Sequence, residues 1–234
     1  LDQEILQEIF LEAMIDGRLK HGDVSNPKGR FINFLASGGE NAQHVFEADS
    51  STSDRHTKTN ISGRQSLLRI LRFVRSLPGC ENTFVVKAQA ETAVRETYRI
   101  IGEEKISCQD YVNGRVFDDA VSYSFYPIDL HDRDGVKPQP LREGVVATVP
   151  IRALIPKGSK NLLVAGRSIS SDRLANSALR VQASSMAMEQ AAGAAALSAS
   201  QGKSPIQIQI SELRQLLLQH QAVVPIPEFT KTDT

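Results

Sequence analysis

The stretch Asn161-Leu-Leu-Val-Ala-Gly-Arg167 is the feature from which the fold of this chain can be inferred. Residues 162–165 form a continuous apolar run, which is typical of a strand buried on both faces of a parallel sheet. After Gly166 and a short polar turn, residues 178–197 combine high helical propensity with few bulky side chains. A strand that leads into a helix N-terminus holds ligands in α/β proteins, because free N–H groups and the positive end of the helix dipole point at the ligand. The stretch therefore predicts a ligand site at the Gly166 turn.

Length and composition exclude several kinds of partner. A chain of 234 residues is long enough for one or two domains, and its 27 Lys and Arg residues balance 27 Asp and Glu residues. This balance gives no electrostatic reason to expect nucleic acid or an anionic membrane as a partner. No apolar run approaches the roughly 20 residues that a membrane span requires. The chain begins at Leu1 without a signal peptide, which favours a start after processing or, more so, inside a larger polypeptide.

The two cysteines, Cys80 and Cys108, match no metal-binding spacing. A disulfide between them is possible, but two buried free thiols are the better interpretation.

Local patterns in the first half of the chain predict both helices and strands. Amphipathic periodicity predicts helices over residues 2–15 and 62–77, and a capping box predicts a short helix from Ser107. The segments that we expect to be strands are residues 31–36, 43–48, 83–90 and 93–101. The polar residues 49–61 are expected to form a long surface loop, and long loops are often functional or mobile. The arginines of the second helix, Arg64, Arg69, Arg72 and Arg75, are interpreted as a solvated helix face, with anion binding as the alternative.

The second half contains one more clear strand and one more helix. Residues 145–151 are expected to form a strand, and residues 212–220 a final helix before a loose tail. Between these elements two signals conflict. Ser204-Pro205 is a good start for a helix, but the isoleucines that follow alternate with glutamines as in an extended connector.

The common catalytic and nucleotide-binding motifs are absent from this sequence. It contains no Gly-x-Gly-x-x-Gly dinucleotide fingerprint, no P-loop, no His-Glu-x-x-His and no Gly-x-Ser-x-Gly. On the residues alone, the sequence predicts the C-terminal part of an α/β protein with a ligand at the Gly166 turn.

Several blocks occur in the order found in one known family. They are Arg95-Glu-Thr-Tyr-Arg-Ile-Ile-Gly102, Tyr126-Pro-Ile-Asp-Leu-His131, Val149-Pro-Ile-Arg-Ala-Leu-Ile-Pro156, the opening stretch with Ser177-Ala-Leu-Arg-Val181, and Met186-Ala-Met-Glu-Gln-Ala-Ala-Gly193. Together they resemble the C-terminal signature of the FAD-dependent oxidoreductase family with the glutathione-reductase-like flavin fold. The resemblance covers roughly residues 59–220.

The resemblance implies an α/β fold, namely an α+β cap plus part of a Rossmann-like FAD-binding domain. Residues 1–144 would belong to a substrate or cap domain, residues 145–203 to the C-terminal segment of the flavin domain, and residues 204–234 to a final helix and tail. The implied cofactor is FAD, and the implied reaction is hydride transfer from an unidentified small organic substrate. The missing N-terminal half of the flavin domain would be a partner and would carry the Gly-x-Gly-x-x-Gly element.

The resemblance also implies site residues. The residues expected along the flavin are Gly166, Arg167, Ser168, Ala178, Leu179, Arg180 and Val181, with the first ones near the ribityl or diphosphate region and the last ones near the pyrimidine. Ser168 stands where relatives often have cysteine, which argues against a thiol redox step. Arg180, expected in a first helical turn, would oppose the helix dipole and pair with a carboxylate. Gly193 is expected to permit close helix–sheet packing. The residues expected on the substrate side are Arg95, Glu96, Asp129 and His131.

Simpler interpretations stand beside these roles. Arg95 and Glu96 could form an ordinary cross-strand salt bridge, and His131 could be a loop histidine beside an aspartate. The main alternative function is a non-catalytic binding or assembly module whose partner surface is the arginine face of residues 62–77. A hydrolase that uses Ser168 or Ser170 with His131 is a more distant alternative, because the sequence lacks a nucleophile elbow.

Overall fold

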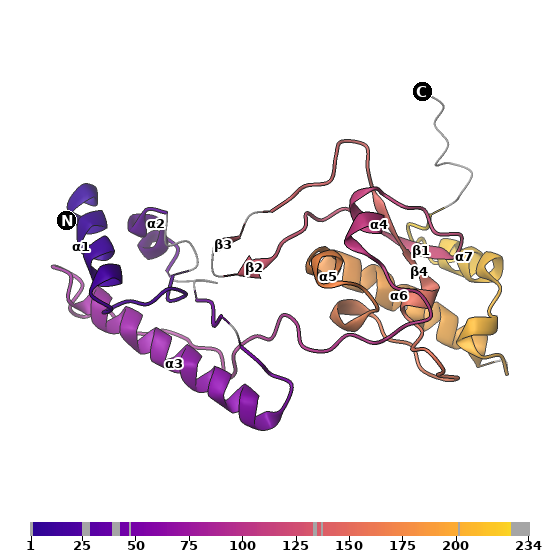
Figure 1. Cartoon of the computed structure of the whole chain (residues 1–234), viewed down its shortest axis with the longest axis horizontal. Coiled ribbons are helices and arrows are strands. Elements are labelled where there is room, and N and C mark those ends of the chain that lie inside the picture. Colours follow the sequence, from indigo (N-terminus) through magenta and orange to yellow (C-terminus); the bar gives the residue numbers. More distant parts are fainter. Residues whose placement is uncertain are drawn as a thin grey trace. The chain divides into compact units, whose positions relative to one another are not determined.

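The computed structural model divides the chain into two compact units. Unit 1 comprises Leu1–Val94 and His131–Gly135, and unit 2 comprises Arg95–Leu130 and Val136–Thr234. The residues that the structure describes are 2–24, 29–38, 43–46, 48–132, 135–136, 138–200 and 202–225, with the backbone alone described at 131, 132, 135 and 136. Figure 1 shows the course of the chain.

The described part of unit 1 contains helices α1 (Gln3–Ile15), α2 (Phe31–Ala36) and α3 (Ser53–Arg75). α1 confirms the helix predicted over residues 2–15, and it begins where the Asp2 carboxylate accepts hydrogen bonds from backbone N–H groups of the first turn. α3 begins at Thr52, whose hydroxyl accepts a hydrogen bond from the Arg55 N–H. The side chains of the three helices meet in one apolar core.

Three phenylalanine rings, one from each helix, form the centre of that core. Phe10 of α1 stacks on Phe31 of α2 with ring centroids 4.7 Å apart, and Phe73 of α3 meets Phe31 edge-on at 5.3 Å. Ring pairs of this kind stabilise by about 0.5–1.5 kcal/mol beyond the area that they bury. The buried apolar residues around the rings are Leu6, Ala13, Leu19, Val24, Ile70, Val74 and Leu77. Ile5, expected on the apolar side of the first helix, is instead half exposed.

Several predictions for this region are wrong. Residues 31–36 form a helix because Phe31 and Phe34, one helical turn apart, stack on each other, whereas a strand would separate them. The polar segment expected to be a loop is helical from Ser53, because the Thr52 cap starts the helix nine residues before the predicted position. Among the described residues, 43–46, 48, 83–90 and 93–101 form no named strand. Val86 shows why, since its 87% exposed side chain lies against no partner that would stabilise a strand.

A buried carboxylate joins the loop after α1 to α3. Asp23 is 1% exposed and accepts hydrogen bonds from Nε and Nη2 of Arg69 at 2.8 and 2.7 Å, and from the Ser66 hydroxyl at 2.6 Å. The Lys20 N–H donates the fourth hydrogen bond at 2.8 Å. Burial alone raises the pKa of Asp23, but these hydrogen bonds outweigh it and leave the pKa below its ordinary value.

A two-stranded antiparallel sheet lies in the core of unit 2. Strand β1 (Ala120–Ser124) pairs with β4 (Ala147–Pro150), with Tyr123 opposite Thr148 and a bulge between Ala120 and Ser122. The predicted strand over residues 145–151 is thereby confirmed, and it passes directly into the short 3-10 helix η1 (Ile151–Ala153).

A second sheet, separate from this one, consists of β2 (His131–Asp132) and β3 (Gly135–Val136).

Helices pack on the β1–β4 sheet. α4 (Cys108–Val112) begins at Ser107 with both hydrogen bonds of the predicted capping box. α6 (Gln182–Ala199) contacts β1 and α7 (Ile210–Gln219). Ser204-Pro205 starts the 3-10 helix η3 (Pro205–Gln207), which resolves the conflict in the sequence in favour of a helical start. The chain therefore has a mixed fold of helices and small antiparallel sheets.

The small-residue run forms two helices in place of the single one that its propensity predicts. α5 (Arg173–Leu179) ends before Arg180, and α6 starts after Val181, which has an extended backbone. Gly193 lies on an exposed face, and a Cβ added to it would have no atom within 4 Å. For the residues that the structure describes, the prediction that Gly193 permits close packing is therefore wrong.

The opening stretch does not form a strand. Residues 162–165 are extended, and the Val164 N–H donates to the Leu154 carbonyl at 2.8 Å, but no described residue pairs with them in a sheet. Leu162 is 52% exposed for the same reason, because a strand buried on both faces needs neighbouring strands and covering helices. The prediction of a doubly buried strand is wrong for the residues that the structure describes.

Cys80 and Cys108 are both free, and both are half-buried rather than fully buried. Burial, with a smaller contribution from the neighbouring Asp172, raises the pKa of the Cys108 thiol. Among the described residues, no helix combines the length and apolar character needed to cross a membrane.

We predict that Asp23→Asn destabilises the chain by about 2–4 kcal/mol, because the amide keeps only one of the two acceptor oxygens, places a donor against Arg69 and removes the buried negative charge that pairs with it. The folded pKa of Asp23 is lowered, so its contribution to stability is present above the unfolded pKa of about 3.9 and is lost as the pH falls through the folded value. Urea unfolding followed by circular dichroism at several pH values measures both effects.

The matched control is Asp16→Asn, which removes a carboxylate from an exposed pair with Arg18. Its unfolding midpoint should change little. Equal midpoints for Asp23→Asn and the wild type at neutral pH would show that the Asp23 cluster does not stabilise the fold.

Candidate functional site

Three segments that are far apart in the sequence lie side by side in unit 2. The Ile100 N–H donates to the Ser168 carbonyl at 2.9 Å, and the Ile106 N–H donates to the Ser170 carbonyl at 3.1 Å. The Glu103 N–H donates to the Ile155 carbonyl at 2.9 Å. Residues 100–106 therefore run between residues 152–157 and 168–172, which places the Arg-Glu-Thr block beside the Gly166 turn.

The Gly166 turn forms the 3-10 helix η2 (Gly166–Ser168), which lies against the first turn of α6. Gly166 has a φ of +76°, a conformation that side chains with a Cβ rarely adopt. A Cβ at this position would lie 3.6 Å from the Ser185 hydroxyl, which is ordinary contact distance. Glycine is therefore required here by its backbone conformation, and the turn stays open on the side of α6.

The junction between α5 and α6 presents free backbone donors. No described side chain caps the N-terminus of α6, and Gln182 and Ala183 in its first turn are exposed. The first N–H groups of an uncapped helix have no partner within the helix, and the helix dipole makes this end positive. An 18-residue helix that begins in this way beside a glycine turn is a suitable site for an anionic or hydrogen-bond-accepting ligand.

Arg180 follows the last residue of α5, so its position differs from the predicted one. The sequence predicts it in the first turn of a long helix, where its charge would oppose the dipole. In the structure it is the C-cap of α5, where a positive charge is favourable. The predicted pairing with a carboxylate is confirmed, because Nη1 lies 3.6 Å from Oε1 of Glu96.

The Arg180 side chain is 7% exposed and holds several segments together. Nη2 donates to the Asp129 carbonyl at 3.1 Å, and Nε donates to the Ser177 carbonyl at 3.4 Å. The Asp129 N–H in turn donates to the Ser177 hydroxyl at 3.0 Å. These bonds connect the α5–α6 junction to the Tyr-Pro-Ile-Asp block.

Ion pairs extend this arrangement into a network of alternating charge. Nη1 of Arg95 lies 3.8 Å from Oδ2 of Asp129, and Nη1 of Arg99 lies 3.4 Å from Oε2 of Glu96. The structure therefore brings together Arg95, Glu96 and Asp129, which the family blocks indicate as substrate-side residues. The predicted alternative of a pair between Arg95 and Glu96 is replaced by separate pairs to other residues.

Removal from solvent has the largest effect on the pKa of the Arg180 guanidinium. Burial lowers the pKa of Arg180, the neighbouring Glu96 carboxylate opposes this shift, and the Arg95 charge adds to it. An arginine stays protonated under all physiological conditions. Counted over the described residues, three arginines and two carboxylates give this network an excess of positive charge beside the positive end of α6.

Sequence reasoning missed Asn176, which is fully buried in α5. Its Nδ2 donates to the Arg167 carbonyl at 3.0 Å and to the Ser171 hydroxyl at 3.2 Å, and these bonds fix the end of η2. Its Oδ1 is buried and has no hydrogen-bond partner among the described residues. An asparagine in a small-residue helix gave the only signal for this role, since asparagine is uncommon in helix interiors.

The remaining predicted residues differ in their exposure. Ala178 and Leu179 are fully buried in the apolar core, so their side chains face protein. Ser168 and Val181 are half-buried, and Arg167 is exposed. The backbone of His131 begins β2, which belongs to unit 1, and its side chain lies outside the described residues. Its predicted role stays a prediction.

The arginines of α3 are largely engaged within the chain. Arg69 binds the buried Asp23, Arg64 donates to the carbonyls of Gln89 and Ala90, and Arg75 donates to the Thr83 carbonyl. Arg64, Arg72 and Arg75 are exposed, as the prediction of a solvated arginine face requires, and the prediction is wrong only for Arg69. The same bonds weaken the hypothesis that this face is a docking surface for a protein partner.

Comparison with known proteins identifies a family. The model of a family described as FAD dependent oxidoreductase matches residues 8–217. Searches of curated proteins and of solved structures found no significant match to this chain. The matched range includes η2, the α5–α6 junction and the charge network.

We predict that Arg180→Gln lowers the stability of the chain by about 1–3 kcal/mol, because it leaves Glu96 without its buried partner and breaks the bond to the Asp129 carbonyl. Arg180→Lys should recover only part of the loss, since lysine keeps the charge but cannot reach several acceptors at once. Chemical unfolding curves measure the differences.

Arg173→Gln is the control, because Arg173 lies on the surface of the same helix. If Arg180→Gln and Arg173→Gln unfold at the same midpoint, the network does not stabilise the junction.

Proposed function

This chain belongs to the FAD dependent oxidoreductase family, and from this premise we propose that it is the C-terminal part of an enzyme that transfers hydride from a small organic substrate to FAD. FAD is the cofactor of the family. The observation that carries the proposal is the meeting of the Gly166 turn, the uncapped N-terminus of α6 and the Arg180 network in unit 2.

The residues at this junction fit one edge of a flavin. The open first turn of α6 offers N–H donors, and Gly166 leaves no side chain between η2 and that turn. The buried Oδ1 of Asn176 is an acceptor without a partner among the described residues, and it lies at the end of η2. A flavin presents both acceptor and donor groups along its pyrimidine edge, and FAD carries a diphosphate, so a positive site with mixed hydrogen-bonding groups suits it.

Residues of this chain would bind the cofactor and hold the junction in position. The backbone of η2 and of the α6 start would hold the cofactor by hydrogen bonds and by the helix dipole. Ala178 and Leu179, fully buried, would set the position of the junction from below through packing. Arg180 would act as a positioning residue, because it fixes Glu96 and Asp129 around the junction. When bound, FAD supplies a two-electron acceptor for the substrate's hydride.

Substrate recognition would fall to the exposed end of the network. The Arg95 side chain is 43% exposed, and its guanidinium can bind a carboxylate or sugar oxygen while Asp129 orients it. His131, two residues after Asp129, would accept or donate a proton at a substrate heteroatom.

The proposal includes a division into domains. Residues 145–203 would complete a Rossmann-like flavin domain, and residues 1–144 would form part of a substrate or cap domain. The extended and half-exposed state of residues 162–165 supports this division, because such an apolar segment is stable as a strand only between other strands. Those strands, with the Gly-x-Gly-x-x-Gly element, would belong to an N-terminal half of the flavin domain.

We predict that the chain extended by the residues encoded upstream of Leu1 binds FAD. The purified extended protein should be yellow, and dithionite should bleach it. In this protein Gly166→Val should weaken FAD binding about tenfold or more, because a branched side chain strains the turn and narrows the gap toward Ser185. Absorbance and equilibrium dialysis measure retention.

Gly158→Val is the matched control, since Gly158 has a φ of +78° but no described atom near its Cβ position. It carries the same backbone strain away from the junction and should retain FAD. A colourless extended protein that cannot be reconstituted with FAD would contradict the proposed function.

We predict that His131→Gln slows the anaerobic bleaching of bound flavin by about 10²–10⁴-fold, because proton transfer by a positioned side chain contributes an effect of this size. The substrate for this measurement is the small organic acid, sugar or amine that bleaches the wild-type extended protein fastest in a screened panel. The flavin spectrum before substrate addition should stay unchanged. Bleaching at the wild-type rate and with the wild-type pH profile would exclude His131 from the reaction.

A further inference from the structure

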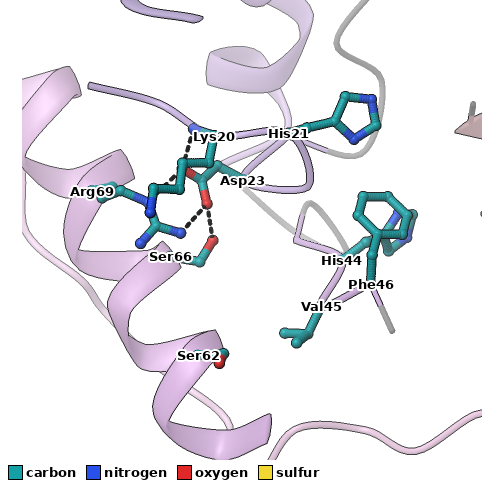
Figure 2. Close-up of a pocket in the computed structure, with 9 residues that line it drawn as sticks. All are labelled: Lys20, His21, Asp23, His44, Val45, Phe46, Ser62, Ser66 and Arg69. Carbon is teal, nitrogen blue, oxygen red and sulfur yellow. Dashed lines mark hydrogen bonds and ion pairs between the residues drawn. The ribbon is translucent and has the colours of Figure 1, made fainter. Parts of the chain in front are cut away.

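A cavity of about 610 Å³ lies within unit 1, apart from the residues assigned to the flavin. Its size falls in the range of about 300–1,000 Å³ that is usual for small-molecule sites. Figure 2 shows Asp23, Ser66 and Arg69 on one side of it and the rings of His21, His44 and Phe46 on the other. The other lining residues are Lys20, Val45 and Ser62.

The walls of this cavity are fixed to one another. The His44 N–H donates to the Gly22 carbonyl at 2.8 Å, and Gly22 approaches so closely that a Cβ would lie 2.5 Å from the His44 carbonyl oxygen. The hydrogen bond from the Ser66 hydroxyl to Asp23 joins the loop after α1 to α3. The Gln43 side chain donates a 3.0 Å hydrogen bond to the Ser66 hydroxyl, which joins residues 43–46 to α3. Three separate segments are thus held at defined positions around the cavity.

The described lining of the cavity has more hydrogen-bond donors than acceptors. Its one carboxylate, Asp23, already accepts four hydrogen bonds. Among the described residues, no partner is found for Nζ of Lys20, for Nη1 of Arg69 or for the Ser62 hydroxyl. Two cations and one carboxylate leave a net positive charge. The lining therefore favours a ligand that carries a negative charge and accepts hydrogen bonds.

The opposite wall is made of flat rings. The Phe46 ring lies 5.3 Å from the His21 ring and 5.8 Å from the His44 ring, measured between centroids. The His21 side chain is exposed and the Phe46 ring is half-buried, so both can contact a ligand. Ring faces and edges pack favourably on other planar groups.

We propose that this cavity binds a planar organic carboxylate, with its carboxylate toward Lys20 and Arg69 and its ring against His21 and Phe46. The ring wall distinguishes such a ligand from a simple inorganic anion, and the donors distinguish it from a neutral aromatic compound. The site lies wholly in unit 1, and its occupancy does not depend on flavin.

The test is an NMR titration of the chain with 2-naphthoate as the probe. Binding at a dissociation constant of roughly 0.1–1 mM is expected for a ligand of this size. 2-Naphthamide keeps the rings without the charge, hexanoate keeps the charge without the rings, and both should bind at least about fivefold more weakly. Inorganic phosphate should not compete with the probe.

Variants locate the site. Lys20→Gln should weaken 2-naphthoate binding about two- to fivefold, the effect of one partly exposed charge. Phe46→Leu should weaken it about three- to tenfold through the loss of ring contact. The matched controls are Lys58→Gln on α3 and Phe84→Leu, both exposed and outside the lining, which should bind as the wild type does.

Three results of the titrations with the probe, its analogues and the variants would overturn the proposal. These are the absence of binding below about 10 mM, equal binding of 2-naphthamide, and unchanged affinity in both Lys20→Gln and Phe46→Leu when circular dichroism shows that the variants are folded. Displacement of the probe by phosphate at similar concentration would also overturn it, because it would show an anion site without aromatic recognition. A failure here leaves the flavin proposal intact, since the extended protein's absorbance is measured independently.

Discussion

The buried guanidinium of Arg180 is the interaction on which the arrangement of the candidate flavin site depends. A charge that is 7% exposed is stable only where acceptors surround it, and Arg180 obtains them from three separate segments. The carbonyl of Asp129, the carboxylate of Glu96 and the carbonyl of Ser177 must therefore lie within its reach. Because the acceptors sit on different segments, fixing one side chain fixes the whole junction.

The break between α5 and α6 follows from the same requirement. A continuous helix would place Arg180 in a helix interior, with its backbone groups paired locally and its charge on the helix surface. Ending α5 at Leu179 turns the side chain toward the carbonyls of residues 129 and 177, and an extended Val181 then allows a new helix to begin. The uncapped N-terminus of α6 is a consequence of this break, so the proposed ligand-binding feature and the buried charge have one structural cause.

The sequence allows local features to be predicted better than partner-dependent ones. The Ser107 capping box and the strand over residues 147–150 depend on nearby residues or on short-range patterning, and both form as predicted. The apolar residues 162–165 have the pattern of a buried strand, but a strand needs neighbours that their own sequence cannot supply. The prediction for Phe31 to Ala36 failed for a related reason, since a short apolar run fits a helix and a strand equally well until tertiary packing decides.

For the candidate site, the family blocks identified Arg95, Glu96 and Asp129 as neighbours, although the pairs that they form could not be foreseen. The pairing depends on where a buried cation sits, and burial is decided by the whole fold.

The two charged clusters, around Asp23 and around Arg180, differ in how their donors and acceptors are balanced. Around Asp23, donors outnumber the single carboxylate, whereas around Arg180 acids and arginines alternate and the excess charge reaches solvent at Arg95. A chain with no net charge thus presents local positive charge in the described parts of both clusters, so composition alone does not reveal where charge is concentrated.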